Sequence, residues 1–212
     1  KLNYRLYEFA IKRDIDLRNF PTYFLRINQR GGIQSFYETG NRLVYSSIQD
    51  YYDWLSRLNI FSENINNFIE INKEGLSKGI TQPNMITESV IVQIDAIIDS
   101  EIDKNPYMKV FMEADSSLMS KSEKDELVIK AKEIVNNKII PAYKNLNNFL
   151  KNQYLPNSRN SIGISDVPGG KEYYEYLARF YTTTNLTPDQ IHEIGLDEIK
   201  RIRSEMEAII KQ

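Results

Sequence analysis

The stretch Ser120–Leu150, SKSEKDELVIKAKEIVNNKIIPAYKNLNNFL, decides the fold class. Ser120 and Glu123 have the spacing of a capping box, in which two side chains satisfy free backbone N–H groups at the start of a helix. Apolar residues then recur at helical spacing for about eight turns, as in a helix that buries one face. They are Leu127, Ala131, Ile134, Val135, Ile139, Tyr143, Leu146, Phe149 and Leu150. Pro141 lacks an N–H, but the pattern resumes at Tyr143, so we expect Pro141 to kink this helix rather than end it.

Two shorter helices are predicted upstream. Ser46 and Ser47 precede the run Asp50–Leu58 with capping-box spacing, which predicts a helix from about residue 47 to 59. A second helix follows, ends near Gly75 and Gly79, and forms an antiparallel hairpin with the first. Its apolar stripe consists of Phe61, Ile65, Phe68, Ile69 and Ile71.

A third helix starts at Pro83, which suits a first helical turn. Its stripe consists of Ile86, Val90, Ile94, Ile97, Ile98 and Ile102. A buried strand over Val90–Ile98 is the alternative, because isoleucine is a better strand former than helix former. The length and period of the pattern favour the helix.

Downstream, Ser158–Gly170 is a polar loop with a short strand considered around Ile162–Val167. A helix from Lys171 to about Tyr181 follows. The last helix starts at Thr187-Pro188-Asp189-Gln190, where an N-cap, an N1 proline and a capping-box glutamine occur in order.

Pro21–Ser35 is the exception, because its pattern indicates short extended or irregular structure before a turn at Gly31-Gly32. The sequence therefore predicts an all-α fold. We expect an irregular multi-helix array with long antiparallel helices and a minor hairpin or irregular insertion near residues 20–40.

The composition excludes several classes of protein. With 41% hydrophobic and 26% charged residues, the 212-residue chain is not intrinsically disordered. It has no apolar run of 18 residues, so no transmembrane segment is predicted. A net charge of -2 argues against nucleic acid as a partner, because binding a polyanion calls for an excess of lysine and arginine. The absence of cysteine excludes thiolate ligands to a metal and a cysteine nucleophile.

The two ends of the chain have unfinished helical patterns. Lys1–Tyr4 enters a helical pattern without an initiator methionine, a signal peptide or a capping residue. The isoleucine-rich pattern after Thr187 continues to the last residues without a stop signal. We therefore expect residues 1–212 to be a single helical segment of a larger domain, cut at both ends.

Candidate reactive groups are few. His192 is the single histidine and precedes Glu193, but Leu196 stands where the second ligand of a His-Glu-x-x-His motif would lie. We therefore predict no metal ligand and no catalytic residue in this chain. Two glycine pairs, Gly31-Gly32 and Gly169-Gly170, would let a ligand approach the backbone, although each also suits a tight structural turn.

Several segments together resemble the bacterial family catalogued as domain of unknown function 885. The resemblance spans nearly the whole chain and is most specific from Gly169 to Met206. It is carried by Asn28–Ile33, Asp50–Leu58, Gly79–Pro83, Ile140–Tyr143, Tyr154–Pro156, Gly169–Tyr174, Thr182–Thr184, Leu186–His192 and Gly195-Leu196.

The resemblance implies a portion of a helical, zinc metallopeptidase-like hydrolase that is exported, periplasmic or lipid-anchored. The family's metal motif, His-Glu followed by Pro-Gly-His-His, is absent here, so the resemblance implies zinc only for the parent protein and predicts this fragment alone to be inactive. His192 receives no metal role and is expected to pack or hydrogen-bond near its helix start. A non-enzymatic helical binding or scaffold protein is the alternative.

In this interpretation the chain forms one wall of a cleft for a peptide substrate, and the remainder of the parent chain is its other partner. The predicted substrate-binding residues are Gly169, Gly170 and Tyr174, within the segment from Asp166 to Tyr174. Tyr173 shares its helical stripe with Leu177 and Phe180 and is the expected core residue, which leaves Tyr174 facing the cleft.

Overall fold

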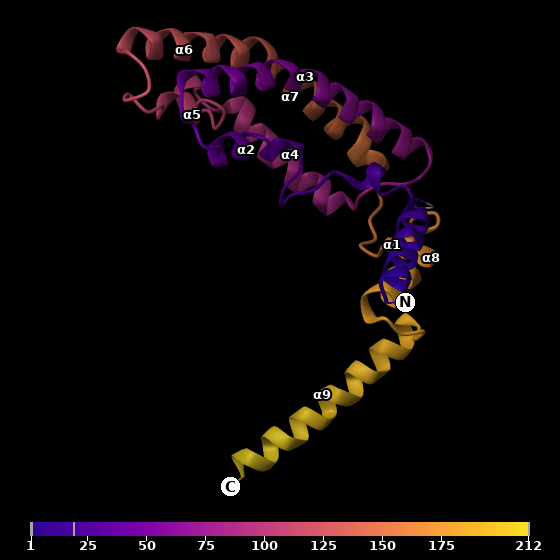
Figure 1. Ribbon diagram of the computed structural model, residues 1–212. Helices are drawn as coiled ribbons and strands as arrows, with labels where there is room; N and C mark the ends of the chain where they lie inside the picture. The colour runs from indigo at the N-terminus through magenta and orange to yellow at the C-terminus, as the bar shows by residue number, and fades with distance from the viewer. Residues whose placement is uncertain (1, 19, 212) are drawn as a thin grey trace. The chain divides into compact units, whose positions relative to one another are not determined.

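The computed structural model describes residues 2–18 and 20–211, and the regular elements in them are helical (Figure 1). Among these residues, one isolated β-bridge joins Pro83 and Arg159, and there is no β-strand. The all-α prediction is confirmed. The chain divides into two compact units, which we call the central unit, Pro21–Ile162, and the terminal unit, Lys1–Phe20 with Gly163–Gln212.

The central unit is built on three long helical segments. α7 packs against both α3 and α4, and α3 also packs along α6. α4 runs in the opposite direction to α3 and α7 (Figure 1). The α-helices are α2 (Tyr37–Arg42), α3 (Ile48–Ser77), α4 (Asn84–Asp99), α5 (Lys109–Met112), α6 (Lys121–Ile134) and α7 (Ile140–Phe149). The 3-10 turns are η1 (Thr22–Leu25), η2 (Ile33–Ser35), η3 (Ile102–Lys104) and η6 (Leu155–Asn157), and η4 (Val135–Ile139) and η5 (Leu150–Tyr154) are π-helical.

The stretch that begins at Ser120 is helical from Lys121 to Tyr154, with the predicted capping box at Ser120 and Glu123. Its apolar stripe is buried except for Ile134, which is half-buried. The N–H of Ile140 donates to the carbonyl of Val135, five residues back, so a π turn immediately precedes Pro141. The wider turn accommodates a residue that has no N–H, and the helix continues past the proline.

α3 is one helix of 30 residues, so the prediction of two helices in a hairpin is wrong. No glycine or proline separates Leu58 from Ile65, and the buried positions continue through Phe61 at intervals of three and four residues. α3 starts at the predicted capping box of Ser47 and Asp50. It is followed by Gly79, whose positive φ of 68° lets the chain leave the helix.

The segments considered as strands are not strands. α4 is helical over Val90–Ile98, as the length and period of the pattern predict. Residues 20–40 form an irregular insertion with the turns η1 and η2 and no hairpin, and residues 162–167 contain the 3-10 turn η7 (Ile164–Asp166). Backbone groups in these segments bond locally, for example Gly32 N–H to the Asn28 carbonyl at 3.1 Å, instead of pairing with another strand.

The terminal unit contains α1 (Leu2–Arg18), η7, α8 (Gly170–Thr182) and α9 (Pro188–Ile210). Aromatic rings join the first and last parts of its sequence: Phe9 stacks on Phe180 with ring centroids 5.3 Å apart, and Phe20 stacks on Tyr173 at 4.3 Å. α9 starts with the predicted capping box of Thr187 and Gln190. Across the described part of the chain, each helix is too short or too polar to span a bilayer.

Replacing Ser120 with alanine should lower the free energy of unfolding by about 1 kcal/mol, because α6 loses its N-cap. Urea denaturation followed by circular dichroism measures the change. Ser122→Ala is the matched control, since Ser122 is an exposed serine in the first turn of the same helix and is not its cap. Equal stability of the two variants would contradict the prediction.

Candidate functional site

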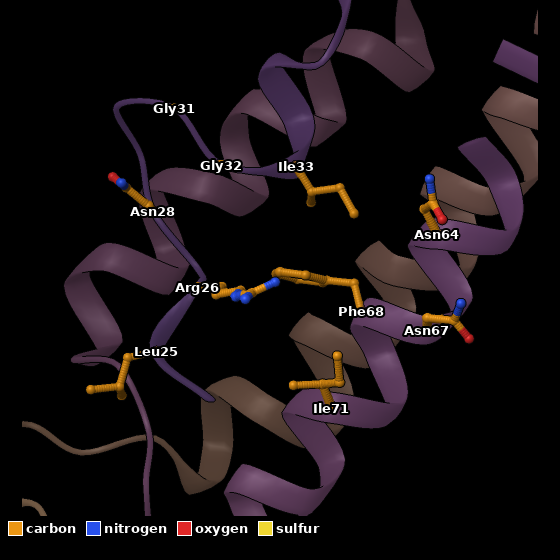
Figure 2. A pocket seen from close by; sticks show the side chains of 10 residues that line it. All are labelled: Leu25, Arg26, Asn28, Gly31, Gly32, Ile33, Asn64, Asn67, Phe68 and Ile71. Carbon is orange, nitrogen blue, oxygen red and sulfur yellow. The ribbon is translucent and has the colours of Figure 1, made fainter. Parts of the chain in front are cut away.

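A cavity of about 650 Å³ lies in the central unit between the segment Leu25–Ile33 and one face of α3 (Figure 2). We call it the α3 groove. Its volume is in the range of small-ligand sites. The groove is lined by Leu25, Arg26, Asn28, Gly31, Gly32, Ile33, Asn64, Asn67, Phe68 and Ile71.

α3 forms one wall because Asn67, Phe68 and Ile71 follow Asn64 by three, four and seven residues, which places them on one side of the helix. Phe68 and Ile71 are half-buried, and Figure 2 shows their side chains and that of Ile33 directed into the groove. The exposed amides of Asn64 and Asn67 stand at the α3 edge. The groove is therefore largely apolar inside and polar at this edge.

The opposite wall is a loop held by amide side chains. The Asn28 side-chain oxygen accepts the Arg30 N–H at 2.9 Å, and the Asn28 carbonyl accepts the side-chain amide of Gln34 at 2.8 Å. The same Gln34 amide donates to the side-chain oxygen of Gln93 on α4 at 2.6 Å. Gln93 in turn donates to the Gln29 carbonyl at 3.0 Å. The loop is thus fixed to the helical frame through α4.

The two glycines of this loop differ in what packing demands of them. A Cβ at Gly32 would lie 2.4 Å from Oε1 of Gln34 and 2.5 Å from the Asn28 carbonyl oxygen, so the loop needs glycine there. A Cβ at Gly31 would meet no described atom within 4 Å. Gly31 therefore leaves the backbone more open at the groove than internal packing requires.

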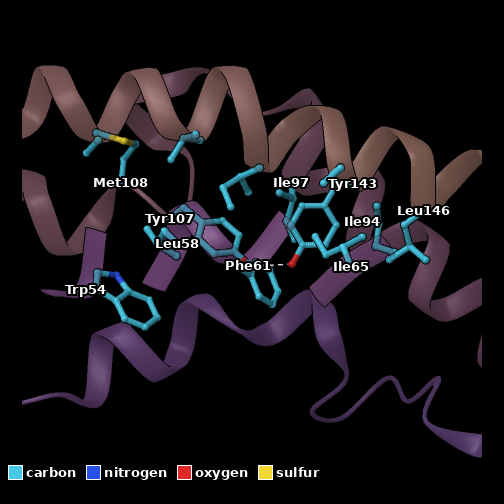
Figure 3. Packing of buried hydrophobic residues seen from close by; sticks show 14 of the residues in the cluster. Trp54, Leu58, Phe61, Ile65, Ile94, Ile97, Tyr107, Met108, Tyr143 and Leu146 are labelled. Carbon is cyan, nitrogen blue, oxygen red and sulfur yellow. Dashed lines mark hydrogen bonds between the residues drawn. The ribbon is translucent and has the colours of Figure 1, made fainter. Parts of the chain in front are cut away.

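Tyr107 and Tyr143 are buried in the core of the central unit (Figure 3), and together they hold the end of the loop at Ile33. The hydroxyl of Tyr143 donates to the Ile33 carbonyl at 2.9 Å. The Tyr107 hydroxyl lies 2.6 Å from the Tyr143 hydroxyl and donates to it, because the Tyr143 proton is already engaged. Two hydroxyl groups thus connect the core of the central unit to the loop that lines the groove.

Burial keeps this tyrosine pair protonated. Desolvation is the main cause that raises the pKa of Tyr107 and of Tyr143 well above the usual value near 10. Both hydroxyls therefore remain hydrogen-bond donors throughout the physiological pH range.

Two arginines of the loop have no carboxylate partner in the described part of the chain. Arg26 lines the α3 groove, and no aspartate or glutamate lines it. Arg30 lines two neighbouring hollows together with Glu38. The α3 groove therefore contains one cationic side chain and no carboxylate to neutralise it.

The residues predicted to bind substrate lie in the terminal unit. Gly169 has a positive φ of 74°, and a Cβ at Gly170 would lie 1.8 Å from the Ile164 carbonyl oxygen, so the turn itself needs both glycines. Tyr173 is half-buried against Phe20, and Tyr174 is 51% exposed. Their role toward a substrate stays a prediction.

His192 is expected from the sequence to pack or hydrogen-bond near the helix start; it is exposed on α9, so the packing alternative is wrong. The first turn of α9 is capped by Thr187 and Gln190 and has no need of an imidazole. Within residues 2–18 and 20–211, no three histidine, aspartate or glutamate side chains are grouped to hold a metal ion.

The sequence prediction identified part of the loop wall of the groove but missed Arg26 on that wall and the whole of the α3 wall. The Asn28–Gly32 segment stands out in the sequence because of its glycine pair. The sequence pattern predicts Phe68 and Ile71 as core residues. Nothing in the local sequence distinguishes Arg26 from other surface arginines. The 64–71 face of α3 lies within the second of the two helices predicted there, but helical spacing alone does not show that the segment Leu25–Ile33 packs opposite it.

Residues 1–212 match the family described as "Bacterial protein of unknown function (DUF885)". The chain belongs to this family. The fold is similar to the crystal structure of a "putative lipoprotein" from Colwellia psychrerythraea, with a TM-score of 0.70 and 24% sequence identity. The match covers 79% of this chain and 29% of that protein, and at this identity it shows the fold alone. Curated proteins gave no match.

Replacing Tyr143 with phenylalanine should cost about 1–3 kcal/mol of stability, because the buried Tyr107 hydroxyl loses its acceptor. Amide hydrogen exchange in the Asn28–Ile33 loop should also become faster than in the unchanged protein. Tyr181→Phe is the control, since Tyr181 is 77% exposed. Unchanged exchange in the loop would show that the tyrosine pair does not position it.

Proposed function

We propose that this chain supplies part of the substrate cleft of a metal-dependent, peptidase-like hydrolase, and that the α3 groove binds peptide. The α3 groove is the observation that carries the proposal. Apolar side chains of a short peptide match Ile33, Phe68 and Ile71. The amides of Asn64 and Asn67 can each donate and accept hydrogen bonds, as recognition of a peptide backbone requires.

The described residues do not fit a zinc site, and we assign them no catalytic step. Their part in the proposed function is to bind and orient the peptide. Metal ligands and a general base would have to come from elsewhere in the complete protein. The resemblance to zinc metallopeptidases is the support for that part of the proposal.

A second contact with substrate is proposed at the start of α8. The backbone turn requires glycine at positions 169 and 170 whether or not a ligand binds there. The proposed contact with substrate therefore rests on Tyr174. Its exposed side chain can present a hydroxyl to a ligand, whereas Tyr173 is stacked on Phe20.

We also propose that the complete protein is exported, periplasmic or lipid-anchored. The support is the fold likeness to a protein described as a lipoprotein and the resemblance of the sequence to an exported family.

A non-enzymatic binding or scaffold protein could use the same groove. The two functions differ in whether bound peptide is cleaved. Binding without cleavage by the complete protein, in the presence of added zinc, would favour the scaffold.

The complete gene product should hydrolyse peptides in a mixed library, and a chelator should abolish the cleavage reversibly. Mass spectrometry of the library before and after incubation, with EDTA and then with excess Zn²⁺, is the measurement. The chain of residues 1–212 should bind members of the library and cleave none. Cleavage that persists after thorough metal removal would contradict metal dependence.

Tyr174→Phe in the complete protein should lower kcat/KM up to about tenfold, because a hydroxyl hydrogen bond contributes about 0.5–1.5 kcal/mol. Tyr173→Phe keeps the stacked ring and should leave kcat/KM within about twofold of the unchanged protein. Steady-state kinetics on a cleaved peptide measure both. Unchanged kinetic constants in Tyr174→Phe would remove this residue from the cleft.

A further inference from the structure

We infer that the α3 groove recognises the C-terminal residue of a peptide, with the free carboxylate on Arg26 and an apolar side chain against Ile33, Phe68 and Ile71. This inference rests on the proposed function and adds the class of peptide. It is drawn from the charge of the groove, the chemistry of its lining and the placement of Arg26.

The charge of the groove favours an anion. Arg26 has no carboxylate partner among the described residues, and no acidic side chain lines the groove. A guanidinium group pairs with a carboxylate through two parallel hydrogen bonds, which fixes both the position and the orientation of the anion. A bound carboxylate would thus supply the counter-charge that the protein does not provide.

The lining indicates which carboxylate binds. Leu25, Ile33, Phe68 and Ile71 line the same groove as this single cation and provide apolar surface. A C-terminal residue carries a carboxylate and an apolar side chain on the same Cα, so it satisfies both features at once. An aspartate or glutamate side chain inside a peptide supplies the anion but leaves this apolar surface without a partner.

The placement of Arg26 fits this arrangement. In Figure 2 the side chains of Arg26 and Phe68 come from opposite walls and point toward one another. A carboxylate on Arg26 therefore places the adjoining side chain near Phe68. Asn64 stands along the same wall, where its amide can meet a preceding peptide group, whereas the Asn67 amide points away from Arg26 in this view.

The loop offers a matched control for Arg26. Arg30 is also exposed and has no carboxylate partner in the described part of the chain, but it lines the neighbouring hollows and not the α3 groove. Removing either guanidinium changes the net charge by the same amount. A general electrostatic effect would therefore weaken binding equally in both variants, and specific recognition would not.

The test is isothermal titration calorimetry of the full chain with acetyl-Ala-Ala-Ala-Leu, as the free acid and as the C-terminal amide. We expect the free acid to bind at least about tenfold more tightly. Arg26→Gln should abolish this preference, and Arg30→Gln should keep it. Circular dichroism of each variant verifies the fold.

Two further probes test the other sources of a carboxylate. Acetyl-Ala-Glu-Ala-Ala amide carries an internal glutamate, and decanoate carries a carboxylate on an alkyl chain. Both should bind at least about tenfold more weakly than the free-acid peptide. Equal or tighter binding of either probe would overturn recognition of a peptide C-terminus.

The remaining outcomes separate this inference from the proposed function. Equal affinity for the free acid and the amide would overturn the inference while peptide binding in the groove stands. Equal loss in the two arginine variants would also overturn it. Failure of all peptides to bind would remove the proposed function as well.

Discussion

Burial of the apolar face of the helical run Lys121–Tyr154 is the constraint on which the rest of the central unit depends. The apolar faces of α3 and α4 pack against this run, so their positions follow from its stripe. Tyr143 lies on the stripe and brings a hydroxyl group into the core. A buried hydroxyl needs a partner, and the partner here is the Ile33 carbonyl of the groove loop. The same burial that defines the core therefore also fixes one wall of the candidate site.

Much of this fold could be predicted from sequence because the deciding signals are local. Ser47, Ser120 and Thr187 each mark the start of a helix, because the first N–H groups of a helix have no backbone acceptor and a capping box supplies side-chain partners. Periodicity is equally local, and it correctly favours a helix over a strand in α4. The predicted break within α3 fails because no residue between Leu58 and Ile65 physically ends a helix. Likewise, a proline inside a helix permits more than one backbone solution, and the π turn before Pro141 is one of them.

The candidate site was harder to predict because its properties arise between distant segments. A Cβ at Gly32 would collide with the Asn28 carbonyl and with the Gln34 side chain, and Gln34 is held by Gln93, which is 59 residues away along the chain. The significance of Arg26 lies in the lack of an acid among its neighbours in the groove, which only the folded arrangement reveals. Conversely, the glycines at 169 and 170 looked like a ligand site, and the structure gives each of them a role in the turn. A glycine pair in a sequence thus indicates an unusual backbone conformation. Whether the glycines serve a tight turn or the approach of a ligand follows only from the atoms that surround them in the fold.

The rigidity of the groove loop bears on how a ligand could bind with useful affinity. Ordering a loop on binding subtracts free energy from the contacts that a ligand makes. Here Asn28 and Gln34 tie the loop to itself, Gln93 ties it to α4, and Tyr143 ties it to α7. Arg26 precedes these anchors, so its side chain can adjust to a ligand while the backbone that follows it stays in place. The groove therefore combines a wall that needs no ordering on binding with one exposed cation, whose side chain alone has to be ordered by the ligand.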